Sequence, residues 1–244
     1  MLGSDVTNPF SNASPLAWEA ALTLTGATLV YLVYNLATSP AAVARLFPGR
    51  DAAGVGDLPS ERLRTTNAFY RKYLGVVLLG LVPAIVLAVT GRLDRAGLQL
   101  PHDVPMTLLL ALGFVAITAL PIVLESRKPA FRLSYPEVRA PLRGKLAAHN
   151  AFAWAIYLLA YEFFFRGVLV VFLAGAVGPL PALTMSTMAY VFAHFGRYPG
   201  EVIGTLVSGT AFGLIALATE SILAPFLAHL AVALLSDTLA SRRV

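Results

Sequence analysis

The chain has 244 residues, of which 57% are hydrophobic and only 13% are charged. This is too little charge to coat a soluble domain of that size, so the composition predicts an integral membrane protein. The absence of cysteine excludes disulfides, thiolate metal sites and cysteine nucleophiles. The net charge of +5 arises in loops between apolar runs, where we expect the basic side chains to contact anionic lipid headgroups and not nucleic acid.

The apolar runs predict seven membrane spans, each close to the ~20 residues that cross a bilayer as a helix. In chain order they cover residues 17–37, 73–90, 105–124, 148–177, 181–196, 202–219 and 221–240. The fourth is long and carries charge, which indicates a tilt or a kink, and the fifth is short for a full crossing. We therefore expect an all-α transmembrane bundle that forms a single domain over residues 1–244.

Lysine and arginine are distributed unevenly between the predicted loops. Fifteen of them fall on one side, in the loops 38–72 and 125–147, at Arg197 and in the tail 242–243. Only Arg92 and Arg95 fall on the other side. The positive-inside rule then predicts an N-terminus outside and a C-terminus in the cytoplasm.

Ionisable residues inside a span cost ~3 kcal/mol on insertion scales, so each one is a functional candidate. Glu162 and Arg166 are four residues apart, which places them on one helix face within pairing distance. Two interpretations of this pair are equally open: an internal salt bridge alone, or part of a reactive site. For Glu19, His149 and Glu220, near the span ends, contact with water or headgroups is the simpler interpretation.

Two histidines lie in later spans, His194 and His229. Each alone is more often a hydrogen-bonded core residue than a catalyst. A buried glutamate that polarises water, with two histidines that bind a metal or stabilise an oxyanion, is the smallest set of side chains that could hydrolyse an amide. Ser208 and His229 would also suit a serine-histidine pair, but the spacing of Gly209 and Gly213 more simply indicates close helix packing.

The segment Tyr-Glu-Phe-Phe-Phe-Arg-Gly at residues 161–167, followed by Tyr190-x-x-x-His194 and then His229, resembles the CAAX-protease and bacteriocin-processing family of intramembrane proteases. That family has the motifs Glu-Glu-x-x-x-Arg, Phe-x-x-x-His and His-x-x-x-Asn in this order. The resemblance covers about residues 146–240 and implies a helical membrane fold with a cavity open to the cytoplasm. By carry-over, Glu162 matches the second glutamate and Arg166 the arginine.

Three positions depart from the family pattern. Tyr161 replaces the first glutamate, which activates the water in the family, and Tyr190 replaces the phenylalanine of the second motif. Ala233 stands four residues after His229, and Asp237, one turn further along the same face, either substitutes for the polar residue or lies at the cytoplasmic interface. Glu162 or Glu201 would then serve as the base, or the chain is a non-catalytic relative.

The resemblance implies an intramembrane endopeptidase that hydrolyses peptide bonds at or near the membrane, with Glu162, Arg166, His194 and His229 as the site. The resemblance leaves two alternatives for a cofactor. Either the two histidines hold a divalent metal such as zinc that assists hydrolysis, or hydrolysis needs no metal. The expected partners are a peptide or prenylated-protein substrate and membrane lipids, in the cytoplasmic membrane of a bacterium or archaeon. The alternative, which Tyr161 favours, is a silent relative that binds peptides or lipidated tails, or assists a membrane partner.

Overall fold

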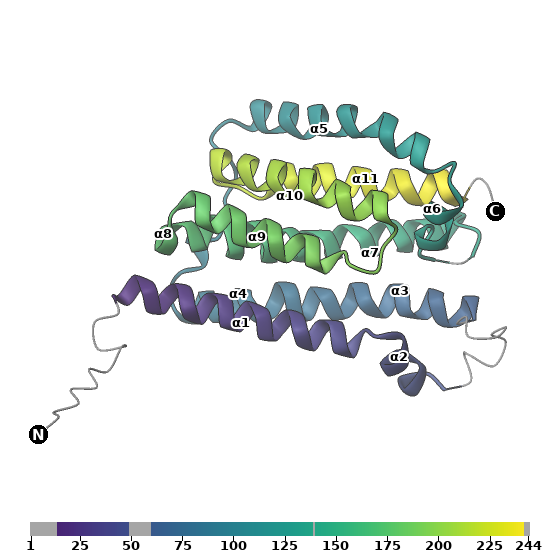
Figure 1. Ribbon diagram of the computed structural model, residues 1–244, viewed down its shortest axis with the longest axis horizontal. Helices are drawn as coiled ribbons and strands as arrows, with labels where there is room; N and C mark the ends of the chain where they lie inside the picture. The colour runs from purple at the N-terminus through teal and green to yellow at the C-terminus, as the bar shows by residue number, and fades with distance from the viewer. Residues whose placement is uncertain (1–13, 49–59, 139, 242–244) are drawn as a thin grey trace, which may run out of the picture.

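The computed structural model describes residues 14–48, 60–138 and 140–241. Within these residues the regular secondary structure is helical throughout, which confirms the predicted all-α class. The long helices run side by side along one direction, and α2, α6 and the end of α11 lie at the same end of the bundle (Figure 1). Four arginines used to predict the orientation lie outside the described residues: Arg50, Arg139, Arg242 and Arg243.

Each predicted span corresponds to a helix or to a continuous series of helices. The bounds of the long elements are α1 (Pro15–Ala37), α3 (Glu61–Gly75) continuing through the π-helix η1 (Val76–Leu81) into α4 (Val82–Val89), α5 (Val104–Glu125), α7 (Gly144–Glu162) continuing through the π-helix η3 (Phe163–Phe172) into α8 (Leu173–Val177), α9 (Pro179–Ala193), α10 (Pro199–Thr219) and α11 (Leu223–Ser241). Between them lie the short α2 (Pro40–Leu46), the 3₁₀ turn η2 (Leu93–Arg95) and α6 (Pro129–Ser134). Within the described residues, six of the long helices are long and apolar enough to cross a membrane, while α9 has only 15 residues.

The second span starts earlier than predicted, at Glu61 instead of residue 73. The Ser60 side chain caps the helix by accepting a hydrogen bond from the Leu63 amide at 3.1 Å, and Glu61 places a negative charge in the first turn. Arg71 and Lys72 therefore lie on a helix and not in a loop. Lys72 is only 1% exposed, so the expectation that it contacts lipid headgroups is wrong.

The continuous helix from Gly144 to Val177 forms the centre of the bundle, with 83% of its most apolar window buried. It packs against helices from both halves of the chain, including α3, α9 and α11. Its middle is wound as the π-helix η3 directly after Glu162, a feature that the sequence analysis did not predict. Such segments are rare and occur often at functional sites.

Glycines allow two close approaches around this central helix. A Cβ on Gly213 of α10 would lie 2.3 Å from the Leu183 side chain of α9, so the predicted role of this glycine in close packing is confirmed. A Cβ on Gly167 of η3 would lie 2.6 Å from the carbonyl oxygen of Ala96. Glycine at residue 167 therefore lets the turn after η2 pack directly on the central helix.

At the opposite end from α2 and α6, Glu19 has specific partners. Its carboxylate lies 3.5 Å from an Arg95 nitrogen and 3.8 Å from an Arg92 nitrogen. The expectation of simple contact with water or headgroups is therefore wrong for Glu19, whose side chain is only 10% exposed. Both arginines are more than 40% exposed, so the pairing ties α1 to the turn after α4 without much stabilisation.

Candidate active site

Glu162 and Arg166 lie where the central helix changes from α7 to η3, and both are buried, with 0% and 1% exposure. An Arg166 nitrogen lies 3.2 Å from one carboxylate oxygen of Glu162 and donates to the other at 3.3 Å. The guanidinium carbon also lies 4.0 Å from the centre of the Tyr190 ring, which is a cation–π contact. Both side chains therefore face the interior of the bundle and not lipid.

The second partner of Glu162 is His229 of α11. The distance from His229 Nδ1 to a Glu162 carboxylate oxygen is 2.5 Å. A carboxylate can only accept, so Nδ1 carries a proton, and in the tautomer with one ring proton Nε2 keeps a lone pair. One negative and one positive charge are thus balanced next to an oriented imidazole, as a low-dielectric interior requires.

His194 is oriented in a similar way at the end of α9. Its Nδ1 lies 2.8 Å from the carbonyl oxygen of Tyr190, and since a carbonyl only accepts, Nδ1 is the donor. The neutral ring therefore also presents Nε2 as an acceptor. The imidazole packs on the Tyr190 ring, with 4.6 Å between the ring centres.

Tyr161, at the position of the missing family glutamate, lies between the two histidines. Its ring centre is 6.3 Å from that of His194 and 5.9 Å from that of His229, and both contacts are edge-on. Tyr161 is 5% exposed. The substitution therefore places an aromatic ring with a phenol at the junction of the two imidazoles.

Tyr161, His194 and His229 all line a cavity of about 510 Å³. Its walls also include tyrosines of α1 and α7 and, towards α6, charged side chains. Glu162 and Arg166 are not among the lining residues, and they lie behind His229. The structure therefore brings the four motif residues together, but only the histidines reach the cavity.

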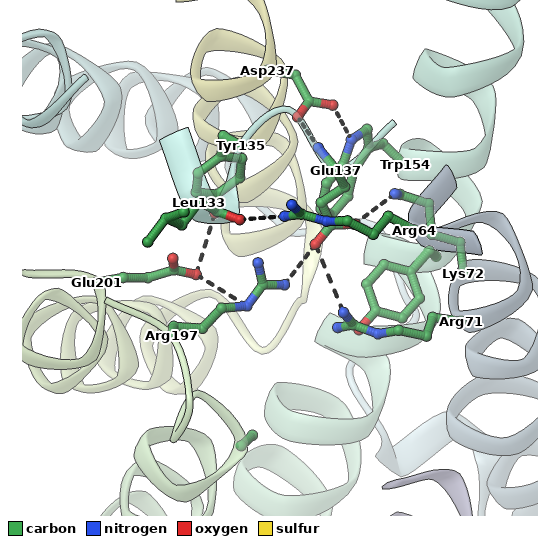
Figure 2. Close-up of polar contacts among 12 residues, drawn as sticks. Arg64, Arg71, Lys72, Leu133, Tyr135, Glu137, Trp154, Arg197, Glu201 and Asp237 are labelled. Carbon is green, nitrogen blue, oxygen red and sulfur yellow. Dashed lines mark hydrogen bonds and ion pairs between the residues drawn. The ribbon is translucent and has the colours of Figure 1, made fainter. Parts of the chain in front are cut away.

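The charged part of the cavity wall is organised by Glu137, in the loop between α6 and α7 (Figure 2). Lys72 Nζ donates to its carboxylate at 2.8 Å, Arg197 donates at 2.6 Å, and an Arg71 nitrogen lies 4.0 Å away. Burial alone would raise the pKa of Glu137, but Lys72, Arg197 and Arg71 together hold it well below its usual range. The sequence interpretation missed Glu137 as a site residue.

Glu201, the alternative base, also lines the cavity, in the first turn of α10. Its carboxylate accepts a hydrogen bond from the Tyr135 hydroxyl at 3.2 Å and lies 3.8 Å from Arg197 Nε (Figure 2). Burial, followed by the charge of Glu201, raises the pKa of Tyr135 well above its usual range, so the phenol stays protonated as the donor. Glu201 thus belongs to the same polar network as Glu137, because Arg197 contacts both carboxylates.

Asp237 is 2% exposed and is not among the residues that line the cavity. Its carboxylate accepts from the Asn150 side chain at 2.9 Å, from Trp154 Nε1 at 2.7 Å and from the Glu137 backbone amide at 3.3 Å. Three donors from separate segments thus hold this carboxylate. Its geometry fits positioning of the Glu137 loop better than replacement of the third-motif polar residue.

Metal binding requires a third ligand beside the two histidines. Within the part of the chain that the structure describes, no group of three or more His, Cys, Asp or Glu side chains could hold a metal ion. At the cavity, the described residues place two imidazoles, the Tyr161 phenol and charged side chains of both signs.

A helical membrane fold with a buried Glu-Arg pair, and with two histidines from separate helices on one cavity, defines a class of membrane-embedded proteins to which intramembrane proteases belong. Residues 145–235 match the family model described as type II CAAX prenyl endopeptidase Rce1-like. The segment that contains Glu162, His194 and His229 therefore matches the CAAX-protease family, and the apolar helices are those of an integral membrane protein. Neither the curated proteins nor the solved structures include a match to the chain.

Proposed function

We propose that the protein is an intramembrane endopeptidase in which His229 is the general base and Glu162 is the residue that positions it. The observation that carries this proposal is the 2.5 Å contact between His229 Nδ1 and Glu162, on an imidazole that lines the cavity. A carboxylate behind an imidazole fixes its tautomer and stabilises the imidazolium that forms when Nε2 takes a proton. Glu162 thus acts through His229 and does not itself contact the water.

In the proposed reaction, Nε2 of His229 removes a proton from a water molecule whose oxygen attacks the carbonyl carbon of the peptide bond. Nε2 of His194 accepts a hydrogen bond from the other O–H of that water and so orients the attack. The proton on His229 then passes to the amide nitrogen as the carbon–nitrogen bond breaks, and a carboxylic acid and an amine are released. The Tyr161 phenol, between both rings, is the available donor for the oxyanion.

The substrate class that fits this proposal is a peptide or a prenylated protein tail presented at the membrane. The cavity of about 510 Å³ is large enough for a few residues of an extended chain. Its tyrosines provide apolar surface with hydroxyl donors, and its charged wall includes Glu137 in the loop that follows α6. A cytoplasmic membrane of a bacterium or archaeon is part of the same proposal.

The test is cleavage of a broad peptide library, prenylated and unmodified, by the purified protein in detergent. Removal of a general base typically costs ~10²- to 10⁴-fold, so His229→Ala should lower kcat/KM by that amount. His194→Ala should abolish turnover, and Glu162→Gln should lower kcat with little change in KM. The matched control is His149→Ala, since His149 stacks on Phe69 and is not a lining residue of the cavity.

A second candidate function is favoured by Tyr161 at the position of the family's glutamate. A silent relative would bind peptides or lipidated tails in the same cavity, or assist a membrane partner, without hydrolysis. Saturable peptide binding by the parent protein, with no cleavage product under any condition, would support this function. Cleavage that is lost in His229→Ala and kept in His149→Ala would exclude it.

A further inference from the structure

An apolar groove runs along α1 on the side that faces η3 and α9. It has a volume of about 360 Å³ and is lined on α1 by a helical stripe that includes Leu24, Thr28 and Asn35. Phe164 of η3 and Phe192 of α9 form part of the opposite wall. Phe192 is 59% exposed, so the groove opens on the surface that faces lipid in a membrane.

The groove adjoins the cavity described above. Tyr31 and Asn35 line both spaces. From Asn35 at the cavity to Leu24 the stripe covers eleven residue steps, which is about 17 Å at ~1.5 Å per residue. A single leaflet of a hydrocarbon core about 30 Å thick has nearly that depth.

The end of the groove at the cavity carries charged side chains of both signs. Arg71, Lys72 and Arg197 face the carboxylates of Glu137 and Glu201, and Asp237 accepts from the Glu137 backbone amide. Arg71 lines the cavity, its side chain is 33% exposed, and its nearest contact with Glu137 is 4.0 Å, so it is the least engaged of the three cations. An anion that entered from the groove would meet this guanidinium, and Arg is well suited to phosphate.

We propose that the groove and the Arg71 end of the cavity together bind one anionic phospholipid, with the headgroup phosphate at Arg71 and an acyl chain along α1. A phospholipid needs a cationic group for its headgroup phosphate and an apolar channel, about one leaflet long, for its acyl chain. Arg71 and the groove along α1 would provide these two features. The site is independent of whether the cavity hydrolyses peptides. A bound phosphate would share Arg71 and Arg197 with Glu137, which links lipid binding to the charged cavity wall.

The chain offers a local reporter for this site. It has two tryptophans, and Trp154 lines the cavity with Lys72 Nζ at 3.9 Å from its ring centre. In a Trp18→Phe background, the fluorescence of Trp154 is followed while delipidated protein in detergent is titrated with dioleoylphosphatidylglycerol. We expect a saturable change with this lipid, and a much weaker one with dioleoylphosphatidylcholine or with glycerol 3-phosphate.

Three variants in that background test the two halves of the site. Loss of one basic contact with an anionic headgroup costs ~1 kcal/mol, so Arg71→Gln should weaken phosphatidylglycerol binding about fivefold. Thr28→Phe, at an exposed position in the groove, should weaken it as well without disturbing the core. Arg92→Gln, which removes the same charge at the other end of the bundle, should leave binding unchanged.

Four results would overturn the proposal. Equal binding of phosphatidylcholine would remove the role of Arg71, and glycerol 3-phosphate binding as tightly as the lipid would make this a site for free phosphate. A farnesylated peptide that gave the saturable response when phosphatidylglycerol did not would assign the groove to a substrate tail. Binding that was unaffected by both Arg71→Gln and Thr28→Phe would place the lipid elsewhere.

Discussion

Replacement of Glu137 by glutamine tests the importance of the charged cavity wall. The change keeps the size of the side chain and removes its charge, which leaves Lys72, at 1% exposure, without its carboxylate. Removing one partner of a buried ion pair costs ~3–5 kcal/mol. Because the side chains of Glu137 and Arg197 are 8% and 21% exposed, we expect the lower end, about 3 kcal/mol.

The assay is thermal unfolding of the purified protein in detergent, followed by tryptophan fluorescence. For a chain of this size ~1 kcal/mol corresponds to about 2–4 °C, so Glu137→Gln should lower Tm by about 6–12 °C. The matched control is Glu125→Gln, which breaks an exposed pair with Lys128 and should cost less than about 1 kcal/mol. The double variant Glu137→Gln, Lys72→Met should recover part of the loss, because no unpaired ammonium remains buried.

Two results would refute this reasoning. If Glu137→Gln were as mild as Glu125→Gln, the three cations would not depend on the carboxylate. If the double variant were no more stable than the single one, the loss would come from the loop and not from an unpaired charge. In either case the charge of Glu137 would not be what stabilises the cavity wall.

The remaining predictions concern pH, a buried anchor, helix packing and topology. Folding lowers the pKa of Glu137, so its pairing stabilises the protein fully at pH values above the usual pKa of ~4.3. This stabilisation should be lost as the pH falls below that value towards the folded-state pKa. A pH series of Tm for the parent and for Glu137→Gln would measure the loss. Asp237→Ala should cost at least about 2 kcal/mol by leaving Asn150 and Trp154 donors unpaired, and a chemical unfolding series that showed no loss would contradict the anchoring role. Gly213→Val should cost ~1–3 kcal/mol in the same unfolding series through overpacking against Leu183. A Cβ added at Gly113 meets no atom within 4 Å, so Gly113→Val should be nearly neutral. Reporter fusions should place the N-terminus outside and the C-terminus in the cytoplasm, and fusions that put both ends on one side would contradict seven passes.

Most of the fold follows from the length of the apolar runs, because a helix is the only compact way to satisfy a backbone in hydrocarbon. The start of α3 was missed for a physical reason. Its residues before position 73 include Arg62, Arg64, Arg71 and Lys72, so they contribute no apolar signal. The helix is held there by the Ser60 cap and by the ion pair of Lys72 with Glu137. Hydropathy cannot reveal an element whose polar face is buried against other polar groups.

The motif residues could be found from the sequence, but their hydrogen bonds could not. The spacing of Glu162 and Arg166 predicts their pairing, since both lie on one helix. The contact of Glu162 with His229 joins residues 67 positions apart, and it depends on how α11 packs on the central helix. It is this contact that moves the role of base from the glutamate to the histidine in our proposal.

Glu137 shows what kind of signal was available and why it was not sufficient. It is the one acidic residue between positions 126 and 147, among six basic ones, so local charge alone indicates that several cations compete for it. Its observed partners lie elsewhere: Lys72 is 65 positions away, Arg197 is 60, and Asp237, which accepts from its backbone amide, is 100. A buried carboxylate is stable only when such distant donors arrive together, so the Glu137 network is a consequence of the tertiary fold and could not be predicted before it was known.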